Sequence, residues 1–165
     1  MRVLLVLLLV IACAGVACAG VDTFVERYGP VAYVDSHGIS VATNGFPVAP
    51  AAFETEVDAT VASWRRALKA ERRACAELSI CLASTTVSWR EYPFPDFRDS
   101  APRAGLALLI EDDGRREIVL VVGYRDPLSD TALGHELGHA ILWCCGLSSG
   151  ESTLLRWADA HGVPF

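Results

Sequence analysis

Residues 135–139 read His-Glu-Leu-Gly-His, and their types and spacing suit the binding of one metal ion. Four residues of an α-helix turn through about 400° and rise about 6 Å, so the imidazoles of His135 and His139 leave the same face. Two neutral imidazoles at this spacing can hold a zinc ion. Glu136 projects about 100° away, where its carboxylate can take a proton from a water that zinc activates.

The five residues resemble the active-site helix of the zincin metallopeptidases, in which HELGH is a common form of the motif. The resemblance implies a zinc-dependent enzyme that hydrolyses peptide or protein substrates, with His135 and His139 as zinc ligands and Glu136 as general base. The alternatives are a zincin fold that has lost activity and serves as a binding or structural module, and a buried helix whose histidines only bond to neighbouring residues.

The third zinc ligand separates the subfamilies of zincins. The metzincin pattern requires glycine at position 142 and histidine at position 145, but this chain has Leu142 and Cys145. The gluzincin pattern takes an acidic residue from the following helix. The resemblance is therefore gluzincin-like rather than metzincin-like.

Helix geometry favours Asp159 as this third ligand. If the two helices pack antiparallel, a rise of 1.5 Å per residue places positions 156–160 opposite the two histidines, and Asp159 falls in that window. Glu151 reaches the site only if the loop after Gly146 folds back. The remaining alternatives are His161, which comes slightly late, and Cys145, which points elsewhere on a straight helix.

The elements around the motif predict an α+β domain with a long helix, a small mixed or antiparallel sheet, the motif helix and a closing C-terminal helix. Alternating and β-branched runs predict the strands, and apolar residues at three- and four-residue steps predict the helices. His37 falls at a hairpin turn and is read as a turn residue. The strands are expected at 31–35, 39–43, 85–89, 104–110 and 117–122, and the helices at 51–78, 131–145 and 152–161.

This order of elements also resembles the minimal zincin core over residues 51–161. In that family an edge strand beside the cleft pairs with an extended substrate. The resemblance therefore assigns the edge-strand role to 104–110 or to 117–122. Residues 92–103 contain three prolines and are expected to form a loop.

The first 19 residues have the pattern of an export signal. A short basic start precedes an apolar run over 3–12, which is too short for a stop-transfer helix, and Ala17-Cys18-Ala19 fits a cleavage site. Residues 20–165 then form a single domain. A second reading takes 10–13 as a lipobox that leaves Cys13 lipidated. Both readings predict an exported protein, which is secreted, periplasmic or lipid-anchored, with membrane contact only through Cys13.

Four cysteines remain in the mature domain, an even number that suggests disulfides in an exported chain. Adjacent Cys144 and Cys145 can hardly bond each other within a helix. Full pairing therefore joins Cys75 and Cys81 to Cys144 and Cys145, in either of two ways. The alternative is four buried thiols.

The net charge of −6 argues against nucleic acid or an anionic membrane surface as a partner. Basic residues cluster at 65–73, and in so acidic a chain this cluster is interpreted as a solvated helix face. The sequence indicates no particular oligomeric state.

Overall fold

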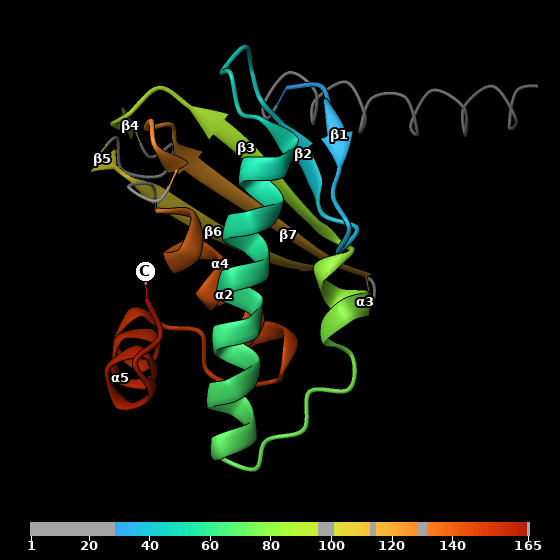
Figure 1. Ribbon diagram of the computed structural model, residues 1–165, viewed down its shortest axis with the longest axis vertical. Helices are drawn as coiled ribbons and strands as arrows, with labels where there is room; N and C mark the ends of the chain where they lie inside the picture. The colour runs from blue at the N-terminus through green and yellow to red at the C-terminus, as the bar shows by residue number, and fades with distance from the viewer. Residues whose placement is uncertain (1–28, 96–100, 113–114, 129–131, 165) are drawn as a thin grey trace, which may run out of the picture. The chain divides into compact units, whose positions relative to one another are not determined.

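Five strands form one mixed sheet with two helices, α2 and α4, on one of its faces (Figure 1). The computed structural model describes residues 29–95, 101–112, 115–128 and 132–164. Residues 31–165 make one compact unit. The α+β class, with its long helix, mixed sheet and two C-terminal helices, is confirmed. The export signal and Cys13 lie outside the described residues and stay predictions.

The sheet has the strand order β1-β2-β3-β7-β6. Strands β2, β3 and β7 run parallel, whereas β1 and β6 are antiparallel to their neighbours. Strand β6 is therefore an edge strand, which selects the first of the two predicted candidates. The bounds are β1 (Tyr33–Val34), β2 (Ser40–Ala42), β3 (Thr85–Arg90), β6 (Gly105–Asp112) and β7 (Arg115–Gly123).

The segment expected to be a loop contains a short ladder of its own. Strand β4 (Phe94–Pro95) pairs antiparallel with β5 (Pro102–Arg103) and makes a separate two-stranded sheet. Prolines are tolerated there because each strand of the ladder is an edge.

The long helix α2 (Pro50–Ala70) ends eight residues before its predicted end. Arg72 adopts a positive φ of 53°, and the N–H of Arg73 donates to the Leu68 carbonyl at 2.9 Å, which closes the helix. A separate short helix, α3 (Leu78–Leu82), follows. The prediction of one helix over 51–78 was wrong because good helix formers continue beyond Leu68, whereas the apolar stripe that packs on the core stops there.

The core lies between the sheet and α2 with α4. The predicted apolar stripe of α2 is buried, and Trp64 at its centre is fully buried. From the sheet, Val87, Trp89 and Leu120 contribute side chains without exposure. This packing holds α4 (Leu133–Cys144) against β6 and β7.

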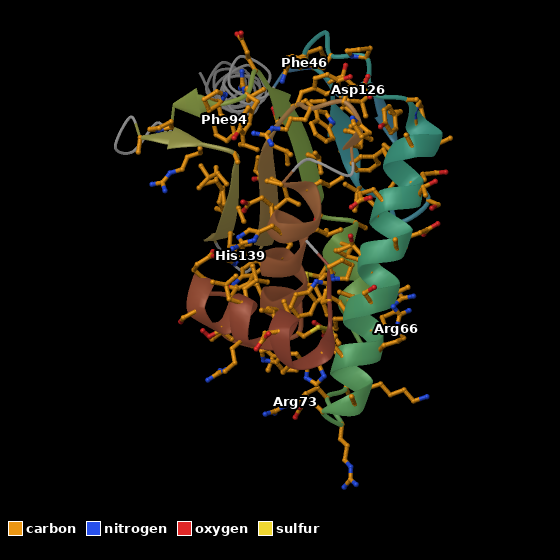
Figure 2. The ribbon with its side chains drawn as sticks, turned by 60° about the vertical axis from the view of Figure 1, so that its left-hand side comes forward. Phe46, Arg66, Arg73, Phe94, Asp126 and His139 are labelled. Carbon is orange, nitrogen blue, oxygen red and sulfur yellow. A yellow bond between two sulfur atoms is a disulfide. The ribbon has the colours of Figure 1, made fainter. Side chains whose placement is uncertain are left out.

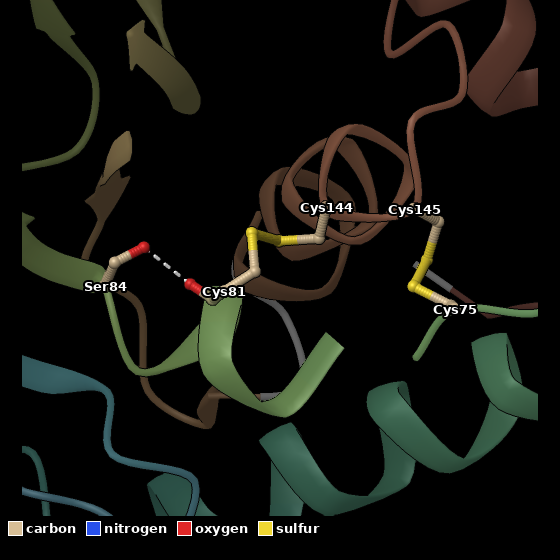
Figure 3. Close-up of a disulfide and its surroundings, with 5 residues drawn as sticks. All are labelled: Cys75, Cys81, Ser84, Cys144 and Cys145. Carbon is tan, nitrogen blue, oxygen red and sulfur yellow. Dashed lines mark hydrogen bonds between the residues drawn. A yellow bond between two sulfur atoms is a disulfide. The ribbon is translucent and has the colours of Figure 1, made fainter. Parts of the chain in front are cut away.

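Two disulfides connect the segment after α2 to the end of α4 (Figure 3). Cys75 bonds Cys145 with a Cα–Cα distance of 4.9 Å, and Cys81 bonds Cys144 with a distance of 5.7 Å. The predicted cross-pairing is confirmed, and it ties the end of α4 to α3 and to the loop that precedes α3. The two bonds indicate an oxidising, extracellular compartment. Among the described helices none is long and apolar enough to cross a membrane.

Candidate metal centre

Helix α4 presents its motif histidines on the side away from the core. Leu133, Leu137 and Ile141 are buried at four-residue steps and fix the inner face of the helix. His135 and His139 are only partly buried, with side-chain exposures of 23% and 12%. The amphipathic pattern of α4 therefore places both imidazoles at the surface of a cleft.

The two imidazoles converge on one carboxylate oxygen of Glu151. His135 Nε2 lies 3.1 Å and His139 Nε2 3.2 Å from Glu151 Oε2, and the two Nε2 atoms are 3.2 Å apart. Ligands held tetrahedrally at zinc distances of 2.0–2.1 Å would be separated by about 3.3 Å. The three atoms thus have the spacing of ligands around a single ion, and these residues form a group that could hold a metal.

The loop before Glu151 fixes the tautomer of His139. His139 Nδ1 lies 2.6 Å from the carbonyl oxygen of Ser149, which only accepts, so Nδ1 carries the proton. In neutral His139 the Nε2 lone pair then faces Glu151. His139 Nε2 and Glu151 Oε2 are both acceptors, so a positive charge between them is favoured.

Glu151 reaches the histidines because the chain returns along α4 as a loop. After α4, Gly146 adopts a φ of 67° and the Leu147 N–H donates to the Leu142 carbonyl. Helix α5 (Glu151–His161) starts only at Glu151. Extended residues advance about 3.3 Å each, against 1.5 Å in a helix. A few extended loop residues are therefore long enough to run back along α4 from its C-terminal end to the level of His139.

The other residues considered as third ligand lie elsewhere. Asp159 is exposed near the end of α5 and does not belong to the group that the described residues form. His161 Nε2 lies 3.2 Å from Glu71 Oε1, and Cys145 is committed to its disulfide. At the hairpin turn, His37 Nε2 lies 2.7 Å from Asp58 Oδ1, away from the site.

Glu136 is buried against β6, with 6% of its surface exposed. Burial raises its pKa to about 8, and the nearby Glu151 carboxylate adds to this, while a hydrogen bond with the Ala107 backbone opposes it. The close packing depends on Gly105, because a Cβ there would lie 2.6 Å from Glu136 Cγ and 2.8 Å from Ala132 Cβ. Nothing in the sequence indicated that Gly105 or the Ser149 carbonyl would support the motif.

A cleft of about 750 Å³ lies between β6 and α4. The Gly123 N–H donates to the Ala104 carbonyl, so the alternation of an antiparallel pair turns the backbone groups of Gly105, Ala107 and Leu109 away from β7. These three residues line the cleft opposite the metal group. Figure 2 labels His139 at this site, between α4 and the C-terminal helix.

The arrangement brings together three side chains that could hold a metal, a buried carboxylate beside them and an edge strand along one cleft. Glu151 is 58% exposed, so the group opens toward solvent on one side. This leaves room for a further ligand, as in zinc sites that carry out chemistry. No family model, no curated protein and no solved structure matches the chain.

Proposed function

We propose that this protein is a zinc-dependent metallopeptidase in which His135, His139 and Glu151 hold the ion and Glu136 is the general base. The observation that carries the proposal is the convergence of both Nε2 atoms on Glu151 Oε2, at 3.1 and 3.2 Å. The hydrogen bond from His139 Nδ1 to the Ser149 carbonyl also leaves a lone pair on Nε2, as a metal ligand requires. A chance surface contact would not require this tautomer. The resemblance of residues 135–139 to the zincin motif supports the same assignment.

A bound zinc ion would polarise the scissile carbonyl and lower the pKa of the attacking water. Glu136 accepts the proton of that water and transfers it to the leaving amine. Its burial suits this task, because a desolvated carboxylate is more basic than one in water. Packing of the carboxylate against β6 also keeps bulk water away from it.

The edge of β6 supports a peptide as substrate. Backbone groups of Gly105, Ala107 and Leu109 face the cleft, and those that are not bonded to Glu136 can pair with an extended chain added as a further strand. Strand addition uses main-chain hydrogen bonds, so it orients the scissile bond of a peptide without requiring a particular side chain. The zincin resemblance implies the same mode of binding.

The proposal is tested by metal content and proteolysis on the same samples. Protein freed of metal with a chelator is titrated with zinc and assayed on unfolded casein, with Glu136→Gln as the matched variant. We expect one zinc per chain in both proteins and cleavage by the wild type alone, because the amide cannot accept a proton. Equal turnover by both proteins, or no zinc binding, would contradict the proposal. Zinc binding without cleavage by the wild type would instead indicate a binding module.

A further inference from the structure

A second cleft, here called the basic pocket, lies where α2 ends. It has a volume of about 380 Å³, and Arg65, Lys69, Arg72 and Arg73 line it together with Leu68 and Leu78. No residue of its lining is acidic. Figure 2 shows Arg73 at the lower end of α2 and Arg66, which does not line the pocket, on the side of the helix.

The local structure at the end of α2 brings the four cationic side chains of the basic pocket together. Arg65 and Lys69 are four residues apart and share one face of α2. The positive φ of Arg72 then turns the chain, and the Arg73 N–H bonds back to the Leu68 carbonyl. Cys75 is bonded to Cys145, the residue after α4, so the far wall of the pocket is anchored as well. The four cations are solvent-exposed, as expected from the sequence, and they also line one defined cleft.

Among the described residues, the four cationic side chains of the basic pocket lack a partner in an ion pair. Neighbouring Glu71 is paired with His161. The chain as a whole carries a net charge of −6, so this positive site stands out against its background. Like charges held around one cleft repel each other, and an anion in the cleft removes that repulsion.

The geometry points to a phosphate-bearing anion as the ligand of the basic pocket. A phosphate monoester offers several acceptor oxygens and up to two charges, which several guanidinium and ammonium donors can share, whereas a single carboxylate can satisfy only one or two of them. Leu68 and Leu78 also line the basic pocket and are each 3% exposed, so its floor is apolar.

Two sources could present this group, a lipid headgroup or a soluble phosphate ester. Ile80 is 76% exposed and follows Ser79, which lines the pocket. An apolar side chain beside a cationic pocket suits a membrane surface, although the net charge of the whole chain argues against one. The experiment therefore uses both sources.

The test compares Arg65→Gln/Lys69→Gln with the control Arg66→Gln/Arg156→Gln. Both variants remove two exposed cations, but only the first changes the basic pocket. The probes are vesicles of phosphatidylcholine with 30% phosphatidylglycerol, measured by co-sedimentation, and glycerol 3-phosphate, measured by calorimetry. We expect the pocket variant to lose about tenfold or more in affinity and the control less than twofold, with a loss of binding at high salt.

Each outcome of this experiment either supports or overturns the proposed phosphate site. Binding to both probes, or to vesicles alone, supports a headgroup site, and binding to the soluble ester alone supports a free ligand. Binding to neither, equal losses in the two variants, or tighter binding of an oligoglutamate peptide than of either probe would overturn the proposal. Unchanged zinc content and melting temperature exclude misfolding of the variants. Glu136→Gln should bind both probes normally, so the result is independent of the proposed peptidase activity.

Discussion

His139 and Ser149 are joined by a hydrogen bond of 2.6 Å from Nδ1 to the backbone carbonyl oxygen, which ties the motif helix to the loop that carries Glu151. The bond orients the imidazole and sets its tautomer. It also fixes the loop two residues before the carboxylate that both histidines face. One short segment therefore carries both the proposed third ligand and the carbonyl that orients His139, and ligand geometry in metal sites depends on such outer-shell partners.

The first prediction concerns the third ligand. Glu151→Gln should weaken zinc binding by about 100-fold or more, since removal of outer-shell partners alone costs about 10–100-fold. Asp159→Asn, the same change eight positions later on the same helix, should leave zinc affinity within about twofold. Competition titrations with a zinc chelator measure both. Loss of zinc binding in Asp159→Asn with retained zinc binding in Glu151→Gln would instead favour Asp159, the ligand expected from helix geometry.

The sequence predicted the two histidines and the fold class because both depend on local periodicity. Amphipathic spacing fixes which face of α4 is buried, and with it the direction of His135 and His139. The helix-length estimate selected Asp159 because it gave the return path a helical rise of 1.5 Å per residue. The loop after Gly146 advances about twice as fast, and no local pattern indicates how such a loop folds.

Contacts between segments that are far apart in the chain could not be predicted from the sequence either. Gly105 and Glu136 are 31 positions apart, and their contact depends on how α4 lies across β6. The disulfide pairing could be predicted from the sequence only in part. Adjacent Cys144 and Cys145 excluded one of three pairings, but the choice between the other two needed the fold.

The second prediction concerns this glycine. In Gly105→Ala the new Cβ would meet the Glu136 carboxylate and Ala132, so the general base must move. We expect kcat on casein to fall by about 100-fold, the scale of a misplacement of about 1 Å, with zinc affinity nearly unchanged. The control is Gly150→Ala, whose Cβ would have Ser148 Oγ at 4.0 Å as its nearest neighbour. Similar losses in the two variants would argue against a specific role for Gly105.

The third prediction separates the two disulfide pairings. Cys145→Ser should leave a free thiol at Cys75 and keep the bond between Cys81 and Cys144. Alkylation of the unreduced protein, followed by peptide mass spectrometry, locates the thiol, and Cys144→Ser should free Cys81 in the same assay. Because the bond between Cys81 and Cys144 is kept, the lost cross-link closes only a short ring through residues 75–81 and 144–145, so the free energy of unfolding should fall by about 2 kcal/mol. A thiol at Cys81 in Cys145→Ser would show the opposite pairing.

The fourth prediction concerns how the stability of the metal-free protein depends on pH. Glu136 has its pKa raised from 4.5 to about 8 by burial and by Glu151. Between these values the unfolded chain has lost the proton that the folded chain keeps, so stability should fall as pH rises from about 4.5 to 8 and then level off. Below pH 4.5 both states are protonated and the penalty vanishes.

Glu136→Gln isolates this effect because the amide cannot ionise, while every other titrating group is shared. In urea unfolding of metal-free samples, the stability of Glu136→Gln relative to wild type should increase from pH 5 to pH 9. Saturating zinc should shrink this difference, because a cation beside Glu136 favours the ionised carboxylate. A difference that stays constant from pH 5 to 9 would mean that Glu136 ionises in the folded protein as it does in water. The carboxylate would then be solvated, and the closed packing of α4 on β6 would not persist in solution.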